Sequence, residues 1–159
     1  MLRTIGAVVL GYLAMALVVF VALSGAYLAV GADGAFRPGV YEVSVLWIGI
    51  SLVVGFGAAL LGGVVARKVA GGARGPRLLA AVVVVLGLAF AAPALLGDAD
   101  AAAPRTGEVG NIEAMQSART PLVVLLLNPL IGAVGVLAGG RAFQTEQAAE
   151  PEAPVAAGG

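Results

Sequence analysis

The sequence contains no cysteine and no histidine, and charged residues make up only 11% of its 159 residues. Without cysteine the chain cannot form a disulfide, a thiolate nucleophile or an iron–sulfur site. Without histidine it lacks the commonest general base and metal ligand. We therefore predict that the protein is not an enzyme, and that it has no catalytic, cofactor-binding or metal site.

Apolar residues are abundant instead. They make up 60% of the chain, and the mean hydropathy is +1.03, which is outside the usual range of soluble domains. Nine basic residues balance nine acidic ones. The basic residues form no long stripe of the kind that neutralises nucleic-acid phosphates. The composition predicts a protein that contacts the lipid bilayer and does not bind nucleic acid.

Four apolar runs are long enough to cross a bilayer, which takes about 20 helical residues. They cover residues 5–30, 43–66, 77–97 and 121–140. The first run, at about 1.5 Å per residue, reaches about 39 Å and exceeds the hydrocarbon core, so it must tilt or overhang. A cleaved signal peptide is the alternative for this run, but its apolar part is longer than such a peptide needs. The four runs predict an all-α polytopic membrane protein, with four transmembrane helices in an antiparallel bundle over residues 1–143.

The segments between and after the spans are also informative. The loop over residues 98–118 contains a possible short surface helix that begins at Asn111 and continues to Met115. The loop after the first span carries Pro38-Gly39, a turn signal, between Phe36 and Tyr41. This loop is either an interfacial turn or a recognition loop. Residues 144–159 have little to bury, and we predict a disordered cytoplasmic tail there.

The distribution of lysine and arginine predicts the orientation, because cytoplasmic loops carry an excess of both. Six basic residues fall on the side of the two termini and three on the other side: Arg3, Arg67, Lys68, Arg74, Arg77 and Arg141 against Arg37, Arg105 and Arg119. Tyr27, Tyr41 and Trp47 fall near the second side, where aromatic rings are expected at the headgroup level. We predict that both termini are cytoplasmic.

Small residues are the most readable packing signal in a membrane helix, because they let two backbones approach closely. The second span has one every four residues, and the fourth span has a shorter version: Ser51, Gly55, Ala59 and Gly63, with Gly135 and Gly139. These residues predict helix packing, either inside the bundle or against a second copy or a partner membrane protein. A protein that packs against itself or a partner is our first functional hypothesis.

Asn128, followed by Pro129, is the one strongly polar side chain well inside a predicted span. Polar groups in the membrane are costly, so function is a default hypothesis for them. Asn128 could bind a ligand, could bond to a neighbouring helix, or could satisfy a kink at Pro129. The second functional hypothesis is therefore a subunit of an oligomeric channel or transporter, with Asn128 and Pro129 lining the passage.

Four acidic residues share the loop before the fourth span: Asp98, Asp100, Glu108 and Glu113. Such oxygens could hold Ca²⁺ or act as general acid and base, which is the third hypothesis. Their spacing matches no calcium loop, and no orienting partner can be inferred. We expect these acids to face water.

The chain resembles the small four-helix membrane proteins of bacteria, to which no activity is assigned. The resemblance rests on residues 31–39, from Gly31-Ala32-Asp33 to Arg37-Pro38-Gly39, and on residues 62–67 at the end of the second span. It implies a location in the bacterial inner membrane and no particular chemistry.

Overall fold

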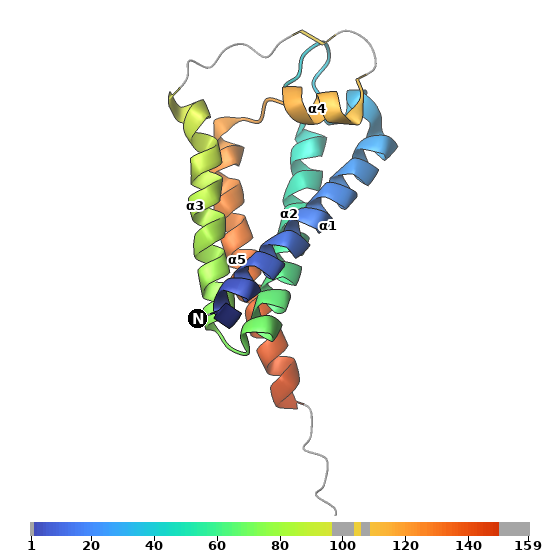
Figure 1. Ribbon diagram of the computed structural model, residues 1–159. Helices are drawn as coiled ribbons and strands as arrows, with labels where there is room; N and C mark the ends of the chain where they lie inside the picture. Colours follow the sequence, from blue (N-terminus) through green and yellow to red (C-terminus); the bar gives the residue numbers. More distant parts are fainter. Residues whose placement is uncertain (1, 97–103, 106–108, 150–159) are drawn as a thin grey trace, which may run out of the picture.

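The computed structural model describes residues 2–96, 104–105 and 109–149. Its helices are α1 (Leu2–Ala35), α2 (Val45–Ala70), α3 (Arg74–Leu96), α4 (Asn111–Ser117) and α5 (Leu122–Ala149). All but α4 are long and apolar enough to cross a membrane. Successive long helices run in opposite directions (Figure 1). The predicted all-α bundle of four antiparallel membrane helices is confirmed.

The ends of the helices differ from the predicted spans for local reasons. Gly31, one residue after the predicted end of the first span, interrupts α1 with φ 67° and ψ −178°, a conformation that favours glycine. At the other end of the chain, α5 continues to Ala149. The prediction of disorder from residue 144 is thus wrong for residues 144–149, where glutamine, glutamate and alanine readily extend an existing helix. The rest of that predicted tail, residues 150–159, lies outside the described residues.

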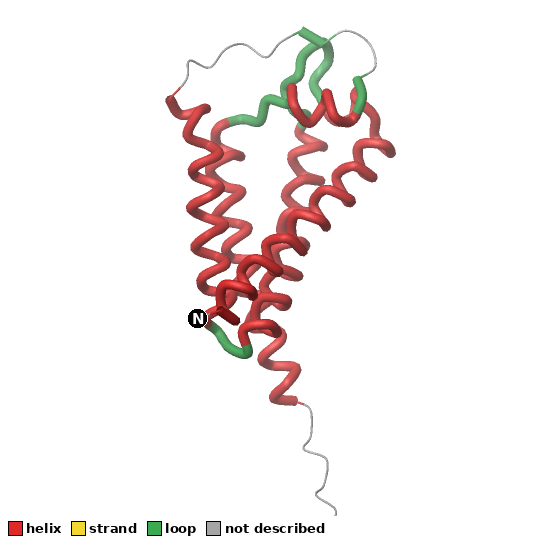
Figure 2. The backbone as a smooth tube through the Cα atoms, viewed as in Figure 1, coloured by secondary structure: helices red, strands yellow, loops and turns green. Residues whose placement is uncertain are grey.

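The long helices form two pairs that meet through α2 and α5. α1 packs mainly on α2, α3 packs mainly on α5, and α2 packs on α5. Within the described residues, no Cα of α1 lies within 8 Å of a Cα of α5. Figures 1 and 2 show that the two pairs diverge toward the end of the bundle where α4 lies.

That end is covered by a small folded unit, which we call the cap; it comprises residues 36–44, 104–105 and 109–121. The predicted turn is confirmed: the Val40 N–H donates to the Arg37 carbonyl at 3.3 Å, and Gly39 has φ 75°. Proline followed by a glycine of positive φ is typical of a type II turn. The predicted short helix is also confirmed as α4, which begins at Asn111.

Backbone pairing joins segments of the cap that are far apart in the sequence. Isolated bridges link Phe36 to Val43, Val40 to Pro104, and Glu42 to Arg119. Each of these bridges is a single pair of residues and not part of a sheet. The cap therefore connects the end of α1 with the segments that precede α4 and α5.

The opposite end of the bundle, which we call the terminal face, holds Leu2 and the connection between α2 and α3 (Figure 1). Arg3 reaches this connection: its guanidinium lies 4.0 Å from where a Cβ on Gly71 would stand. The last turn of α2 contributes Arg67 and Lys68, and α3 begins at Arg74. Basic residues from separate helices are thus gathered at one end of the bundle.

Candidate functional site

The row of small residues on α2 begins in the core of the bundle, and its last member toward the cap lies in the wall of a cavity. Near the terminal face α2 touches α5 so closely that a Cβ on Gly63 would collide with the Val136 backbone, and a Cβ on Gly139 with the Leu60 backbone. One turn higher, a Cβ on Gly135 would stand 2.7 Å from the Ala59 Cβ. These four small residues of the predicted set pack inside the bundle.

The other two residues of the predicted set do not share this contact. A Cβ on Gly55 would meet no other atom within 4 Å, so this glycine takes no part in a close contact between helices. Ser51, one turn further toward the cap, lines a cavity. Of the four α2 residues at this spacing, Ala59 and Gly63 therefore pack on α5, Ser51 lines the cavity, and Gly55 does neither.

This cavity, which we call the lateral cavity, has a volume of about 620 Å³. It lies between α1, α2 and α5, and residues of α4 and the cap line its end. Most of its wall is apolar, and it includes Met15, Val19, Phe20 and Leu23 of α1. The polar side chains in the wall are spread along its length: Tyr12, Ser24, Tyr27, Ser51, Asn111, Thr120 and Asn128.

The predicted pair Asn128 and Pro129 has two separate roles. Pro129 is buried, and it packs where a Cβ on Gly87 of α3 would otherwise stand. Asn128 is exposed in the wall of the lateral cavity, and no other described residue hydrogen-bonds to its side chain. Because proline has no N–H, the Leu125 carbonyl also lacks its usual helix donor. The proline thus fixes α5 on α3, and the amide is available in the cavity wall.

At the cap end of the lateral cavity, hydrogen bonds tie α1 to the segment that contains α4. The Asn111 side-chain amide donates to the Ser24 hydroxyl at 3.1 Å. The Tyr27 hydroxyl donates to the Val109 carbonyl at 2.6 Å, and its ring meets Trp47 edge-on, with centroids 6.0 Å apart. These bonds hold α4 over the opening between the helix pairs.

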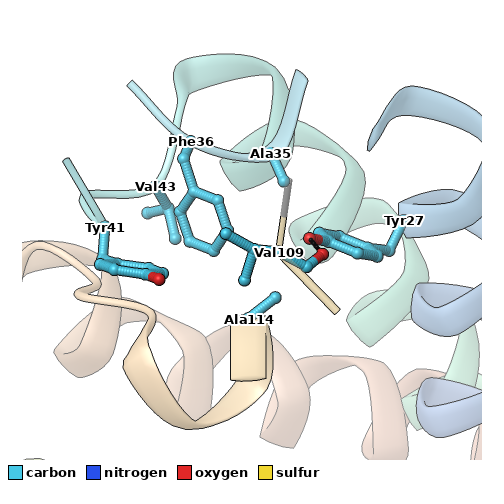
Figure 3. Packing of buried hydrophobic residues seen from close by; sticks show 7 residues of the cluster. All are labelled: Tyr27, Ala35, Phe36, Tyr41, Val43, Val109 and Ala114. Atoms are coloured by element: carbon cyan, nitrogen blue, oxygen red, sulfur yellow. Dashed lines mark hydrogen bonds between the residues drawn. The ribbon is translucent and has the colours of Figure 1, made fainter. Parts of the chain in front are cut away.

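The core of the cap is a separate hydrophobic cluster (Figure 3). Phe36 and Tyr41 lie inside it with ring centroids 5.5 Å apart, so they are not a free recognition surface on the loop. Tyr27 also belongs to this cluster and is 6% exposed. The tyrosines predicted to lie at headgroup level therefore pack against protein, because the cap supplies a second apolar core outside the spans.

Of the acidic residues predicted to face water, Glu113 is the one that lies within the described residues. It accepts a hydrogen bond from the Tyr41 hydroxyl at 2.8 Å. This bond to a carboxylate raises the pKa of Tyr41 above its ordinary value, and partial burial adds to the effect. Asp98, Asp100 and Glu108 lie outside the described residues, so the proposed acidic cluster is not assembled in the described part of the chain.

The Tyr41 hydrogen bond makes the stability of the cap sensitive to alkali. The folded state holds the Tyr41 proton to a higher pH than the unfolded chain, so its contribution is present below about pH 10 and is lost as the pH rises through the folded-state pKa. We expect Tyr41→Phe to be less stable than the wild type below about pH 10, and to lose less stability between about pH 8 and about pH 11. Unfolding followed by near-UV circular dichroism measures both; equal pH slopes in the two proteins would contradict the assignment.

A second, more polar cavity of about 570 Å³ lies beside the end of α1; we call it the polar cavity. It is lined by Tyr27, which also lines the lateral cavity, and by the interrupted end of α1. Arg105 and Asp33 lie in its wall, and the guanidinium Nη2 is 2.5 Å from the Asp33 carboxylate. No pattern in the sequence indicates this pair, because 72 residues separate its members and they meet only when the cap folds.

Comparison of the chain with models of protein families, with curated proteins and with solved structures found no match. The class of the protein follows from its four long apolar helices. It is a multi-pass α-helical membrane protein, with four spanning helices and a cap at the end opposite to its described termini.

Proposed function

We propose that this chain is a non-enzymatic membrane protein that binds one hydrocarbon chain of a lipid-like molecule in the lateral cavity. The observation that carries the proposal is the cavity itself. Its 620 Å³ falls within the range of about 300 to 1,000 Å³ that is typical of small-molecule sites. A mostly apolar wall with a few polar groups is also typical of such sites.

The extent of the cavity is compatible with a lipid chain. Its lining extends along α1 from Tyr12 to Tyr27, which at 1.5 Å per residue is about 22 Å. A mostly apolar wall over this length matches a hydrocarbon chain that lies along the helix, because burial of its apolar surface is favourable.

The position of the cavity supports access from the bilayer. In the described part of the chain no Cα of α1 lies within 8 Å of a Cα of α5, which leaves room for the cavity to open between these two helices toward the surrounding lipid. α4 and the cap line its end on the aqueous side. A molecule that enters sideways keeps its chain in an apolar environment throughout. Asn128 can then hydrogen-bond to an ester or carboxyl group that water does not reach.

The two hypotheses from the sequence, a protein that packs against itself or a partner and a channel or transporter subunit, have less support. Ala59, Gly63, Gly135 and Gly139 are used for packing within one chain, so association with a second copy or a partner must use other surfaces. A passage through one bundle is opposed by the same contact, because α2 and α5 close against each other below the cavity. Asn128 supports the channel or transporter hypothesis only if several copies of the chain assemble around a common passage that this side chain lines.

We also propose that both termini are cytoplasmic and that the protein resides in a bacterial inner membrane. The orientation is supported by the basic residues of the terminal face, and the membrane by the sequence resemblance. In this orientation the cap and both cavities belong to the outer leaflet and its aqueous side.

The single tryptophan of the chain makes the proposal testable, because Trp47 lines the lateral cavity. A monounsaturated fatty acid brominated at its double bond is the probe, added to the purified protein in detergent. We expect it to quench Trp47 fluorescence saturably, and the unbrominated acid to reverse the quenching.

The matched variants are Ser51→Phe and Val53→Phe. Ser51 lines the cavity, whereas the Val53 side chain is 74% exposed on the outside of α2. We expect Ser51→Phe to weaken binding about tenfold or more, since a lost chain contact is worth about 0.8 kcal/mol per buried CH₂. Val53→Phe should bind like the wild type. Quenching that never saturates, or that is equal in both variants, would overturn the proposal.

A further inference from the structure

The chemistry of the wall of the lateral cavity indicates which kind of lipid fits it. Of the described residues that line this cavity, none carries a charge. The polar members of the wall are hydroxyl and amide side chains, which are neutral at physiological pH. Burying an ionised group is costly unless a group of opposite charge pairs with it. The wall is therefore suited to a ligand whose polar group is uncharged.

The charged side chains near the cap are directed to other partners. Each acidic residue described in this region is bonded to a residue outside the wall of the lateral cavity: Asp33 to Arg105, Glu42 to Arg37, and Glu113 to Tyr41. The same pairs engage two of the arginines near the cap. A charged ligand in the lateral cavity would thus find no partner of opposite charge in the described part of its wall.

Two neutral polar side chains, Ser51 and Asn128, line the cavity at a similar depth. α2 and α5 run in the same direction, since both begin at the cap end (Figure 1). Where these helices touch, the α5 residue has a number 73 to 79 higher than its α2 partner, as in the pair Gly63 and Val136. The number of Asn128 is 77 higher than that of Ser51. Each lies about 9 Å along its helix from the first residue, at 1.5 Å per residue.

Both of these side chains are available to a ligand, because no described residue hydrogen-bonds to either of them. A carboxamide offers two donors and an acceptor, and a hydroxyl group both donates and accepts. Toward the terminal face, the α1 residues in the wall between Met15 and Phe20 are all apolar, and Tyr12 ends the lining. The cavity thus combines neutral hydrogen-bonding groups near the cap with a long apolar part.

We propose that the lateral cavity selects an uncharged single-chain lipid, whose carboxamide or hydroxyl group bonds to Asn128 and Ser51 while its chain extends toward Tyr12. This inference rests on the proposed function, because it specifies the polar group of the same ligand. A neutral polar group exchanges its bonds to water for bonds to these two side chains. An ionised group loses its hydration and gains no charged partner.

The test uses the full-length protein in detergent and three probes with the same brominated hydrocarbon chain: a primary amide, an alkyl sulfate and an alkyl trimethylammonium salt. The charged probes carry a permanent charge, because a fatty acid can bind in its protonated, uncharged form. The readout is saturable quenching of Trp47 fluorescence. For the wild type we expect the amide to bind about tenfold more tightly than either charged probe, or better, since an unpaired charge is costly to bury.

Two substitutions locate the selectivity. Asn128→Leu and Ser51→Ala remove the hydrogen-bonding groups and leave the wall apolar. We expect each to weaken binding of the amide about three- to tenfold, and to change binding of the charged probes less than about twofold. Leu127→Ala is the matched control, because Leu127 is the neighbouring residue of α5 and does not line the cavity. Partition of a probe into detergent is the same for every variant, so differences between the proteins report contacts in the cavity.

The outcomes separate the two proposals. If all three probes bind the wild type equally and saturably, the chain site stands and the inference about the polar group is wrong. It is also wrong if the double variant Asn128→Leu, Ser51→Ala, shown by circular dichroism to be folded, keeps the full preference for the amide. Tightest binding of the sulfate or of the trimethylammonium probe would overturn it as well, since a charged group would then pair with the ligand. If no probe quenches saturably, both proposals fail.

Discussion

Replacing Gly63 with leucine is expected to cause the largest loss of stability of any single substitution in α2. The Cβ of any new side chain would overlap the backbone of Val136 on α5, and backbone atoms cannot move aside as a flexible side chain does. The helices must therefore separate where they pack most closely. We expect a loss of about 3 kcal/mol or more in the free energy of unfolding, the upper range for overpacked sites.

Gly55→Leu is the matched control for this substitution. It makes the same chemical change on the same helix two turns away, where a Cβ has open space. We expect it to change stability by less than about 1 kcal/mol, the size of the helix-propensity difference between glycine and leucine. Unfolding by a denaturing detergent, followed by Trp47 fluorescence, compares the two. Equal stability of the two variants would mean that Gly63 of α2 does not pack against the Val136 backbone of α5.

Replacing Leu79 with alanine is expected to have the second largest effect. Leu79 is a completely buried side chain of α3, and its Cδ2 would lie 2.8 Å from a Cβ on Gly11 of α1. It therefore fills the space where α1, α2 and α3 meet, together with Ala66 and Ala80. Truncation leaves a void that lipid chains cannot reach, so its wall loses packing contacts without replacement. We expect a loss of about 2 to 3 kcal/mol, the lower range for buried leucines in soluble cores.

The neighbouring Leu78 provides the control, because its side chain is 44% exposed on the lipid side of the same helix. In Leu78→Ala, lipid chains take the place of the lost methyl groups, so we expect a change below about 0.5 kcal/mol. The same detergent unfolding experiment measures both variants. Equal losses in the two would mean that α3 packs on the bundle through a different face.

These predictions depend on one physical feature of membrane helices. A helix in a soluble protein shows its buried face as an apolar stripe, whereas a membrane helix is apolar all round because lipid is as apolar as the protein interior. Nothing in the runs of leucine, valine and alanine distinguishes Leu79 from Leu78. The small residues gave a partial signal, since they indicated that α2 and α5 allow close approach but not where the contact ends.

The residues that line the two cavities were also only partly predictable from the sequence. Asn128 stood out in the sequence because polar side chains are rare inside spans, and Ser51 stood out as a small residue; both line the lateral cavity. Asp33 and Arg105 did not stand out, because charged residues are ordinary in loops and at the ends of spans, and Tyr27 was predicted only as an aromatic ring at the headgroup level. Their meeting depends on the cap, which joins residues far apart in the sequence.

The sequence by itself determined the number of membrane spans, their approximate ends, their alternating direction, the Pro38-Gly39 turn and the short helix α4. It could do so because the transfer of apolar residues into lipid and the conformational limits of proline and glycine are local properties of the chain. Only the tertiary structure decided which faces of the helices pack, where α2 and α5 separate to leave the lateral cavity, and that Arg105 reaches Asp33. Those features depend on close fitting between distant segments, and the helix faces that fit together are as apolar as the faces that meet lipid.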